Sequence, residues 1–116
     1  MKKLGLILAA TFVASSLTSN VYANDGEALF KSKTCITCHQ AGGKGSGPFP
    51  ELAGLDKAYI VAQFTAIQGG TRGGGMTAVM KANPGVASVK AGEIGTIADY
   101  LSALPRKSSN KGMKAK

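Results

Sequence analysis

The sequence predicts an all-α protein in which three to four helices are joined by long glycine-rich loops. Apolar residues recur at helical spacing in several segments, and no segment alternates apolar and polar residues as a half-buried strand does. The chain has 16 glycines and no tryptophan in 116 residues, so its helices alone would enclose a thin hydrophobic core. Small domains of this kind often depend on a metal or a cofactor. We therefore expect the loops to wrap a bound group.

The first helix is predicted over residues 26–33, with Asp25 as its cap and with Leu29 and Phe30 on its apolar side. Both cysteines follow this helix. After them, residues 40–50 are rich in glycine and proline, which indicates a loop. The chain therefore turns sharply soon after its first helix.

The second helix is predicted over residues 57–68, where Asp56 can cap its start and Gly69-Gly70 ends it. Its apolar residues at helical spacing are Ile60, Phe64 and Ile67.

Thr77 can cap a short helical turn over residues 78–83, which Pro84-Gly85 ends. The last helix is predicted over residues 90–104, and Pro105 ends it. One face of this helix carries Ile94, Ile97, Ala98 and Leu101.

Residues 1–23 are predicted to be a cleaved signal peptide. Lys2 and Lys3 precede an apolar stretch over residues 4–17, and small residues before Asn24 form a cleavage site. A membrane anchor is the alternative, but the apolar run is short for a bilayer span and serine and threonine interrupt its second half. We therefore expect an exported, periplasmic protein without a transmembrane segment after cleavage.

The net charge of +8 is distributed unevenly along the chain. Residues 24–105 carry seven Lys or Arg and six Asp or Glu, whereas residues 106–116 carry five Lys or Arg and no acid. We expect a basic, disordered tail that either solubilises the protein or docks to an acidic partner or an anionic membrane surface. Nucleic acid is not an expected partner, because the chain has no base-reading module.

The motif Cys-x-x-Cys-His holds both cysteines, Cys35 and Cys38, and the one histidine of the chain, His39. It is the attachment signature of a c-type haem, in which each thiol forms a thioether with a haem vinyl group. A thioredoxin-like dithiol would need a βαβ context, and a zinc site would need a fourth ligand, so both are weaker interpretations. The sequence therefore predicts one covalently bound haem c with its iron.

With this motif, the chain resembles the class I c-type cytochromes, and among them the small bacterial monohaem cytochromes of the c4/c553 kind. The resemblance covers residues 24–105, which we take as the cytochrome c domain. The segments that carry it, in the order of the family, are GEALFKSKTCITCH (26–39), GPFPELAG (47–54), AYIVAQFTAIQGGTR (58–72) and IGTIADYLSALP (94–105). It implies the class I cytochrome c fold, wrapped around one haem.

The resemblance also implies roles for individual residues. His39 would be the proximal iron ligand, and the carbonyl of Pro48 would accept a hydrogen bond from its other ring nitrogen. Tyr59 and Arg72 would contact the haem propionates. The first and last helices would cross closely at Gly26, Phe30 and Tyr100.

The sixth iron ligand is expected to be a methionine, because no second histidine exists and a thioether favours Fe(II). Met76 and Met80 lie four residues apart in GGGMTAVMKAN, so only one can bind the iron. Met76 follows three glycines, which let the backbone approach a flat cofactor, and Thr77 can cap the turn after it. Met80 lies closer to the last helix. We favour Met76 as the distal ligand, with Met80 as the alternative.

These features predict an exported, monomeric one-electron carrier rather than an enzyme, since the chain has no catalytic constellation. Its partners would be redox proteins, with acidic docking surfaces that suit the basic tail. One alternative is a dedicated electron-accepting subunit of a periplasmic dehydrogenase. Another is a gas-binding haem sensor, in which the sixth position is open.

Overall fold

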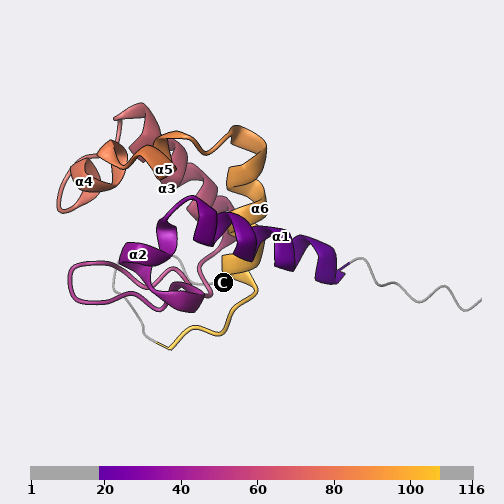
Figure 1. Cartoon of the computed structure of the whole chain (residues 1–116). Coiled ribbons are helices and arrows are strands. Elements are labelled where there is room, and N and C mark those ends of the chain that lie inside the picture. The colour runs from indigo at the N-terminus through magenta and orange to yellow at the C-terminus, as the bar shows by residue number, and fades with distance from the viewer. Residues whose placement is uncertain (1–18, 108–116) are drawn as a thin grey trace, which may run out of the picture.

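The computed structural model describes residues 19–107, with side chains from Asp25 onward (Figure 1). Most of the predicted signal peptide, residues 1–18, lies outside the described residues, as do residues 108–116 of the predicted tail. Within the described part, no helix is both long and apolar enough to cross a membrane.

The described residues form helices and loops with no named strand, so the prediction of an all-α fold is confirmed. Three helices exceed ten residues, and the others are single turns or little more. Their bounds are α1 (Ser19–Ser32), α2 (Cys35–His39), the 3-10 helix η1 (Ala41–Gly43), α3 (Lys57–Gly69), α4 (Thr77–Ala82), α5 (Pro84–Ala87) and α6 (Ala91–Ser102).

The first helix is longer than predicted. Helix α1 begins at Ser19, so Asp25 lies inside it and does not cap it. No glycine or proline interrupts residues 19–25, and the helical backbone therefore continues toward the N-terminus.

Helix α3 agrees closely with its prediction. The Asp56 carboxylate accepts a hydrogen bond from the backbone N–H of Tyr59 at 3.1 Å, and this satisfies one of the free donors of the first turn. At the other end, Gly70 adopts a left-handed conformation with φ of 74°. The sequence signals for this helix are local, which explains why they were sufficient.

The segment after α3 differs from its prediction. Met76, not Thr77, is the N-cap residue of α4. Thr77 is the first residue of the helix, and its hydroxyl donates to the carbonyl of Gly74 at 2.7 Å. Pro84 was expected to end the turn, but it occupies the first turn of α5. Asn83 caps α5 by accepting from the backbone of Gly85 at 2.8 Å, so a new helical turn begins where the previous one stops.

Helices α1 and α6 pack against each other (Figure 1). They approach most closely at Gly26, as predicted. A Cβ atom at Gly26 would lie 2.6 Å from the carbonyl oxygen of Thr96 and would also collide with the Cβ of Tyr100. The rings of Phe30 and Tyr100 pack beside the crossing with their centroids 5.9 Å apart. Only a glycine at this position allows the two helices to approach to this distance.

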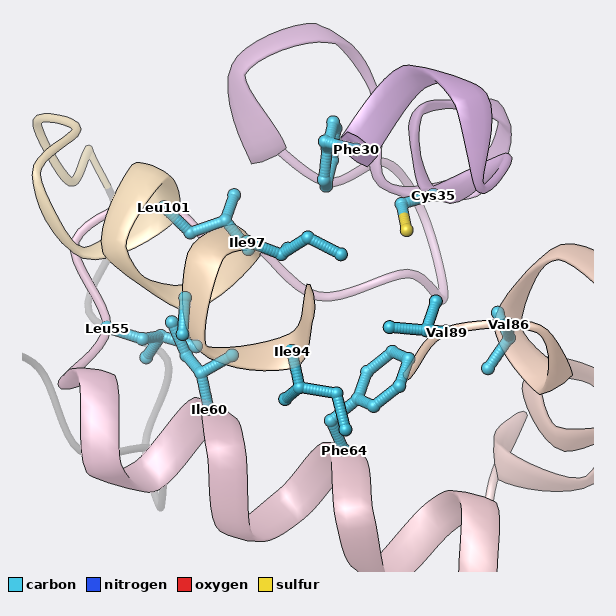
Figure 2. Close-up of a cluster of buried hydrophobic side chains, with 11 residues drawn as sticks. Phe30, Cys35, Leu55, Ile60, Phe64, Val86, Val89, Ile94, Ile97 and Leu101 are labelled. Atoms are coloured by element: carbon cyan, nitrogen blue, oxygen red, sulfur yellow. The ribbon is translucent and has the colours of Figure 1, made fainter. Parts of the chain in front are cut away.

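The hydrophobic core lies between α6 and its two long neighbours, and Figure 2 shows the side chains that meet there. All four residues predicted on the apolar face of α6 are buried, as are the three on α3. The largest fully buried side chains are Phe30, Leu55 and Leu101. Cys35 joins the edge of this cluster, so the cysteine motif is packed against the core rather than displayed on a separate loop.

The described chain remains packed beyond Pro105. Arg106 donates to the carbonyl oxygens of Glu51 and Ala53, and the backbone N–H of Lys107 donates to the Glu51 carboxylate. The prediction that the disordered tail begins at Arg106 is therefore wrong for its first two residues. They are held because polar groups of residues 51–53 need hydrogen-bond partners there.

We expect Gly26→Ala to lower the free energy of unfolding by about 1–3 kcal/mol, because the new methyl group overpacks the crossing of α1 and α6. Gly95→Ala is the matched control, since Gly95 lies in α6 and a Cβ there would meet nothing within 4 Å. That change should stabilise the helix by up to about 1 kcal/mol. Urea denaturation of both variants measures the difference. Equal stability of the two variants would show that the close crossing does not constrain the fold.

Candidate functional site

A cavity of about 540 Å³ opens between the helical core and the loops around α2 and α4. Cofactor sites usually enclose roughly 300–1,000 Å³, so its volume suits a bound cofactor. Phe30 of α1, Phe64 of α3 and Leu101 of α6 contribute to its apolar inner wall.

All eight residues predicted to bind the cofactor line this one cavity, although they come from distant parts of the sequence. They are Cys35, Cys38, His39, Pro48, Tyr59, Arg72, Met76 and Met80. The fold therefore brings the complete set of predicted site residues together.

The cysteine motif forms a one-turn helix, α2, that sharp turns separate from its neighbours. Thr34 before it and Gln40 after it have positive φ values of 64° and 67°, which are uncommon for residues with side chains. The Thr34 hydroxyl donates to the side-chain oxygen of Asn83 at 2.8 Å. This bond fastens the start of the motif to the segment that connects α4 and α5.

Gly85 allows this contact between distant segments. A Cβ atom at Gly85 would lie 2.5 Å from the Thr34 hydroxyl oxygen and would collide with the carbonyl of Lys33. The glycine of the Pro84-Gly85 pair thus has a packing role in addition to the predicted turn.

The environment of the two thiols disfavours a role as a redox dithiol. Cys35 is buried and Cys38 half-buried, and burial raises the pKa of the Cys35 thiol to about 11. Disulfide oxidoreductases need the opposite, a thiol whose pKa is lowered so that the thiolate is present at neutral pH. The thiols do lie one helical turn apart, at the spacing that a covalent attachment to one cofactor face requires.

His39 is held in one orientation by a single hydrogen bond. Its Nδ1 lies 3.0 Å from the carbonyl oxygen of Pro50. A carbonyl can only accept, so Nδ1 carries the proton and Nε2 keeps a free lone pair. Burial lowers the pKa of His39, against the opposing effect of the bond to Pro50, so the imidazole is neutral at pH 7. A neutral imidazole with this tautomer is ready to bind a metal through Nε2.

The partner of His39 corrects the prediction, which assigned this hydrogen bond to the carbonyl of Pro48. Pro48 lies inside a tight turn closed by reciprocal backbone hydrogen bonds between Ser46 and Phe49, each 3.0 Å long. The chain returns toward the imidazole only after this turn, and Pro50 is the next residue. Pro48 still lines the cavity.

Met76 and Met80 lie on successive turns of the same segment, and the backbone N–H of Met80 donates to the carbonyl of Met76 at 3.1 Å. Met76 is 40% exposed, at the N-terminus of α4, whereas Met80 is partly buried against the hydrophobic core. Val79 beside them is also exposed. Both methionines line the cavity together with the cysteine motif.

The other two predicted residues occupy different depths. Tyr59 in the first turn of α3 is half-buried and packs against the core. Arg72 is exposed just beyond α3, where its backbone N–H donates to the carbonyl of Ala66. Arg72 is the cationic residue that the loop after α3 contributes to the cavity lining.

These donor groups suit a flat, largely apolar cofactor that contains iron. An imidazole nitrogen and a thioether sulfur are the axial pair of many electron-transfer haems, and two thiols on one turn can attach the ring. Among the described residues, no group of three or more His, Cys, Asp or Glu is placed to hold a bare metal ion. The residues present thus fit a haem better than a bare metal ion.

Comparisons with known proteins agree with this geometry. The sequence model of the Cytochrome c family matches residues 23–105. Cytochrome c-552 of Acidithiobacillus ferridurans is 35% identical over 97 residues, which are 78% of this chain and 40% of that protein. The structure of cytochrome c4 from Acidithiobacillus ferrooxidans superposes with a TM-score of 0.59 at 32% identity. It was described as supporting a complex-induced tuning of electron transfer.

The superposition covers 72% of this chain and 50% of that cytochrome c4. The chain therefore spans half or less of the length of the relatives that it matches. The family match nevertheless includes α2, α3, α4, α5 and α6 and the whole lining of the cavity. The chain therefore belongs to the cytochrome c family, as a class I c-type cytochrome of the c4/c553 kind with covalently bound haem c.

Proposed function

We propose that the protein is a one-electron carrier whose haem iron alternates between Fe(III) and Fe(II). The observation that carries this proposal is the hydrogen bond from His39 Nδ1 to the Pro50 carbonyl, which leaves Nε2 free in a cavity also lined by two methionines. Two protein ligands leave no open position for a substrate, and such a centre transfers electrons.

In this proposal, Cys35 and Cys38 hold the haem through thioether bonds, and His39 is the proximal ligand. The bond to Pro50 fixes the plane of the imidazole and increases its basicity toward iron. In the folded chain, burial raises the pKa of the Cys35 thiol, which disfavours the reactive thiolate.

Met76 is the proposed distal ligand, with Met80 as the alternative. Met76 follows Gly74 and Gly75, which have φ values of 94° and 54° and have nothing within 4 Å of a Cβ position. This open, glycine-rich backbone can place the thioether of Met76 where the iron requires it. Met80 already contacts the hydrophobic core, which suits a methionine that fills the space beside the cofactor.

We propose that Arg72 and Tyr59 contact the carboxylates of the haem propionates. Arg72 offers a charged donor at the edge of the cavity, and the hydroxyl of Tyr59 is a neutral donor nearer to the core. A guanidinium binds carboxylates in a defined, planar geometry, which would help to fix the haem edge.

The partner would be a redox protein with an acidic surface. Two segments that contribute residues to the cavity lining, 34–50 and 72–83, carry Lys44, Arg72 and Lys81 and no Asp or Glu. Exposed apolar groups at Met76 and Val79 lie in the second of these segments. A small apolar contact surrounded by one sign of charge suits a short-lived complex that charge accelerates.

The periplasm is the proposed location, on the basis of the predicted signal peptide over residues 1–23. Attachment of haem to two thiols also explains how the cysteines would persist in an oxidising compartment without forming a disulfide.

The ligand assignment predicts different spectra for two methionine variants. In oxidised Met76→Ala, we expect loss of the weak far-red band of methionine-bound Fe(III), and the reduced form should bind CO readily. Met80→Ala should keep the band but lose stability, because it removes a partly buried side chain. If only Met80→Ala loses the band, Met80 is the ligand. If wild-type protein lacks the band and binds CO, the gas-sensor alternative replaces the carrier proposal.

The attachment of haem through both cysteines predicts that Cys35→Ser/Cys38→Ser contains no covalent haem. Because the haem would fill the 540 Å³ cavity against the core, this variant should also lose cooperative thermal unfolding. Thr37→Ala, an exposed substitution inside the same motif, should retain both properties. Haem staining after denaturing electrophoresis and circular dichroism measure them. A haem-free double variant with cooperative unfolding would contradict the role of haem in the core.

Positive charge on the two segments that contribute to the cavity lining predicts how fast small inorganic reagents exchange electrons with the protein. Lys44→Gln/Lys81→Gln should slow electron exchange with anionic hexacyanoferrate severalfold at low ionic strength, and the difference should fade above about 0.1 M salt. Exchange with cationic hexaammineruthenium should not slow. The double control Lys31→Gln/Lys57→Gln removes the same charge away from these segments. Lys31 pairs with Glu27 within α1, and Lys57 at the start of α3 pairs with Asp99 of α6. Stopped-flow rates that fall equally in both double variants would refute a localised docking surface.

A further inference from the structure

Arg106 lies beyond the end of α6 and is fastened to the loop that follows Pro50. Its Nη1 atom donates to the carbonyl oxygen of Glu51 at 3.2 Å and to that of Ala53 at 3.0 Å. The next residue adds a third contact, because the backbone N–H of Lys107 donates to the Glu51 carboxylate at 2.8 Å. The Glu51 residue is only 6% exposed, so a charged group is buried at this junction. Such a group is retained only where it is hydrogen-bonded or paired.

The junction is closely packed and depends on a glycine. Gly54 has a φ of 70°, and a Cβ atom there would lie 2.6 Å from the Cβ of Arg106 and 3.1 Å from the carbonyl oxygen of Leu104. The backbone N–H of Gly54 donates to the carbonyl of Leu101, the last buried residue of α6, at 2.9 Å. The end of α6 and the loop are therefore joined by backbone contacts as well as by the guanidinium.

The loop held by Arg106 is the one that carries the partner of His39. The Pro50 carbonyl and the Glu51 N–H belong to one rigid peptide plane, and Arg106 binds the carbonyl of the following peptide. On its other side the loop is held by the Gly43 carbonyl, which accepts from Leu52 at 2.7 Å. Loss of the guanidinium would remove the hydrogen bonds to the carbonyls of Glu51 and Ala53, which are part of what fixes the direction of the Pro50 carbonyl.

We propose that Arg106 is a positioning residue for His39. It fixes the Pro50 carbonyl, which strengthens the hydrogen bond from Nδ1–H and thereby makes Nε2 a better donor to the iron. A better donor stabilises Fe(III), so Arg106 acts to lower the reduction potential. This inference rests on the proposed function, in which His39 is the proximal ligand.

The charge of Arg106 and its positioning role have opposite effects on the potential. A positive charge near the haem disfavours Fe(III), so the loss of that charge by itself lowers the reduction potential. Loss of the fixed carbonyl weakens the hydrogen bond of His39 and raises the potential. The sign of the change therefore separates the two effects.

The test compares three variants of the haem-containing protein. Arg106→Met removes the charge and the donors but keeps an unbranched stem against Gly54. Arg106→Lys keeps the charge and loses the planar guanidinium. Lys57→Met is the control for charge, because exposed Lys57 lies at the start of α3 and pairs with Asp99 of α6. Two quantities are measured in each: the reduction potential, and the hydrogen-exchange rate of the His39 Nδ1 proton in the reduced, diamagnetic state by NMR.

We expect Arg106→Met to raise the potential and to speed exchange of the Nδ1 proton roughly tenfold or more, as the loss of hydrogen bonds to a charged group implies. The increase in exchange should exceed the increase in the unfolding equilibrium constant of the same variant. Arg106→Lys should lie between the wild type and Arg106→Met in both quantities. Lys57→Met should leave the exchange rate unchanged and should not raise the potential.

A potential that falls in Arg106→Met as it does in Lys57→Met would overturn the proposal, and so would an exchange rate that follows global unfolding alone. If Arg106→Met does not fold, Arg106→Lys decides by itself, and values identical to the wild type would overturn the proposal. A wild-type protein without histidine–methionine ligation would instead refute the proposed function on which this inference rests.

Discussion

The hydrogen bond between the imidazole of His39 and the carbonyl of Pro50 is the interaction on which the rest of the site depends. It determines which ring nitrogen is free, and it requires the loop over residues 40–54 to fold back over α2. Thr34 and Gln40, which both have positive φ values, make that return possible, because they turn the chain sharply on both sides of the motif. Such conformations persist only where surrounding contacts compensate for them. The bond from Thr34 to Asn83 is one such contact.

The core and the cofactor cavity share residues, so folding and haem binding are coupled in this protein. Phe30, Ile97 and Leu101 are buried in the helical core and also line the cavity. A haem in the cavity would pack against the side of these residues that faces the cavity, which the thin core does not cover. A ligand that binds only the folded state stabilises that state by its binding free energy, and covalent attachment makes this contribution permanent. Such coupling would stabilise a domain whose sequence is rich in glycine.

Local signals in the sequence predicted the helices well, whereas loop contacts between distant residues could not be predicted. Helix α3 has both a capping aspartate and a terminal glycine, and α6 has an unbroken apolar face, so neither depends on tertiary context. His39 binds the carbonyl of Pro50 and not that of Pro48 because of a turn between Ser46 and Phe49. The hydrogen bonds of that turn are evident only in the folded chain. The contacts of Arg106 with Glu51 and Ala53 span more than fifty residues, and a basic run after Pro105 is typical of a disordered tail. A possible signal was Glu51 itself, an acidic residue next to an apolar leucine in a loop that otherwise carries no acid.

The two sides of the proposed iron site differ in how many contacts hold them in place. On the proximal side, His39 is buried and its supporting loop is bound to both η1 and the end of α6. On the distal side, Met76 is exposed and follows glycines that contact nothing within 4 Å of a Cβ position. Segments with few contacts open most readily, so a partner protein that docks at the cavity opening would meet the adjustable half of the site first.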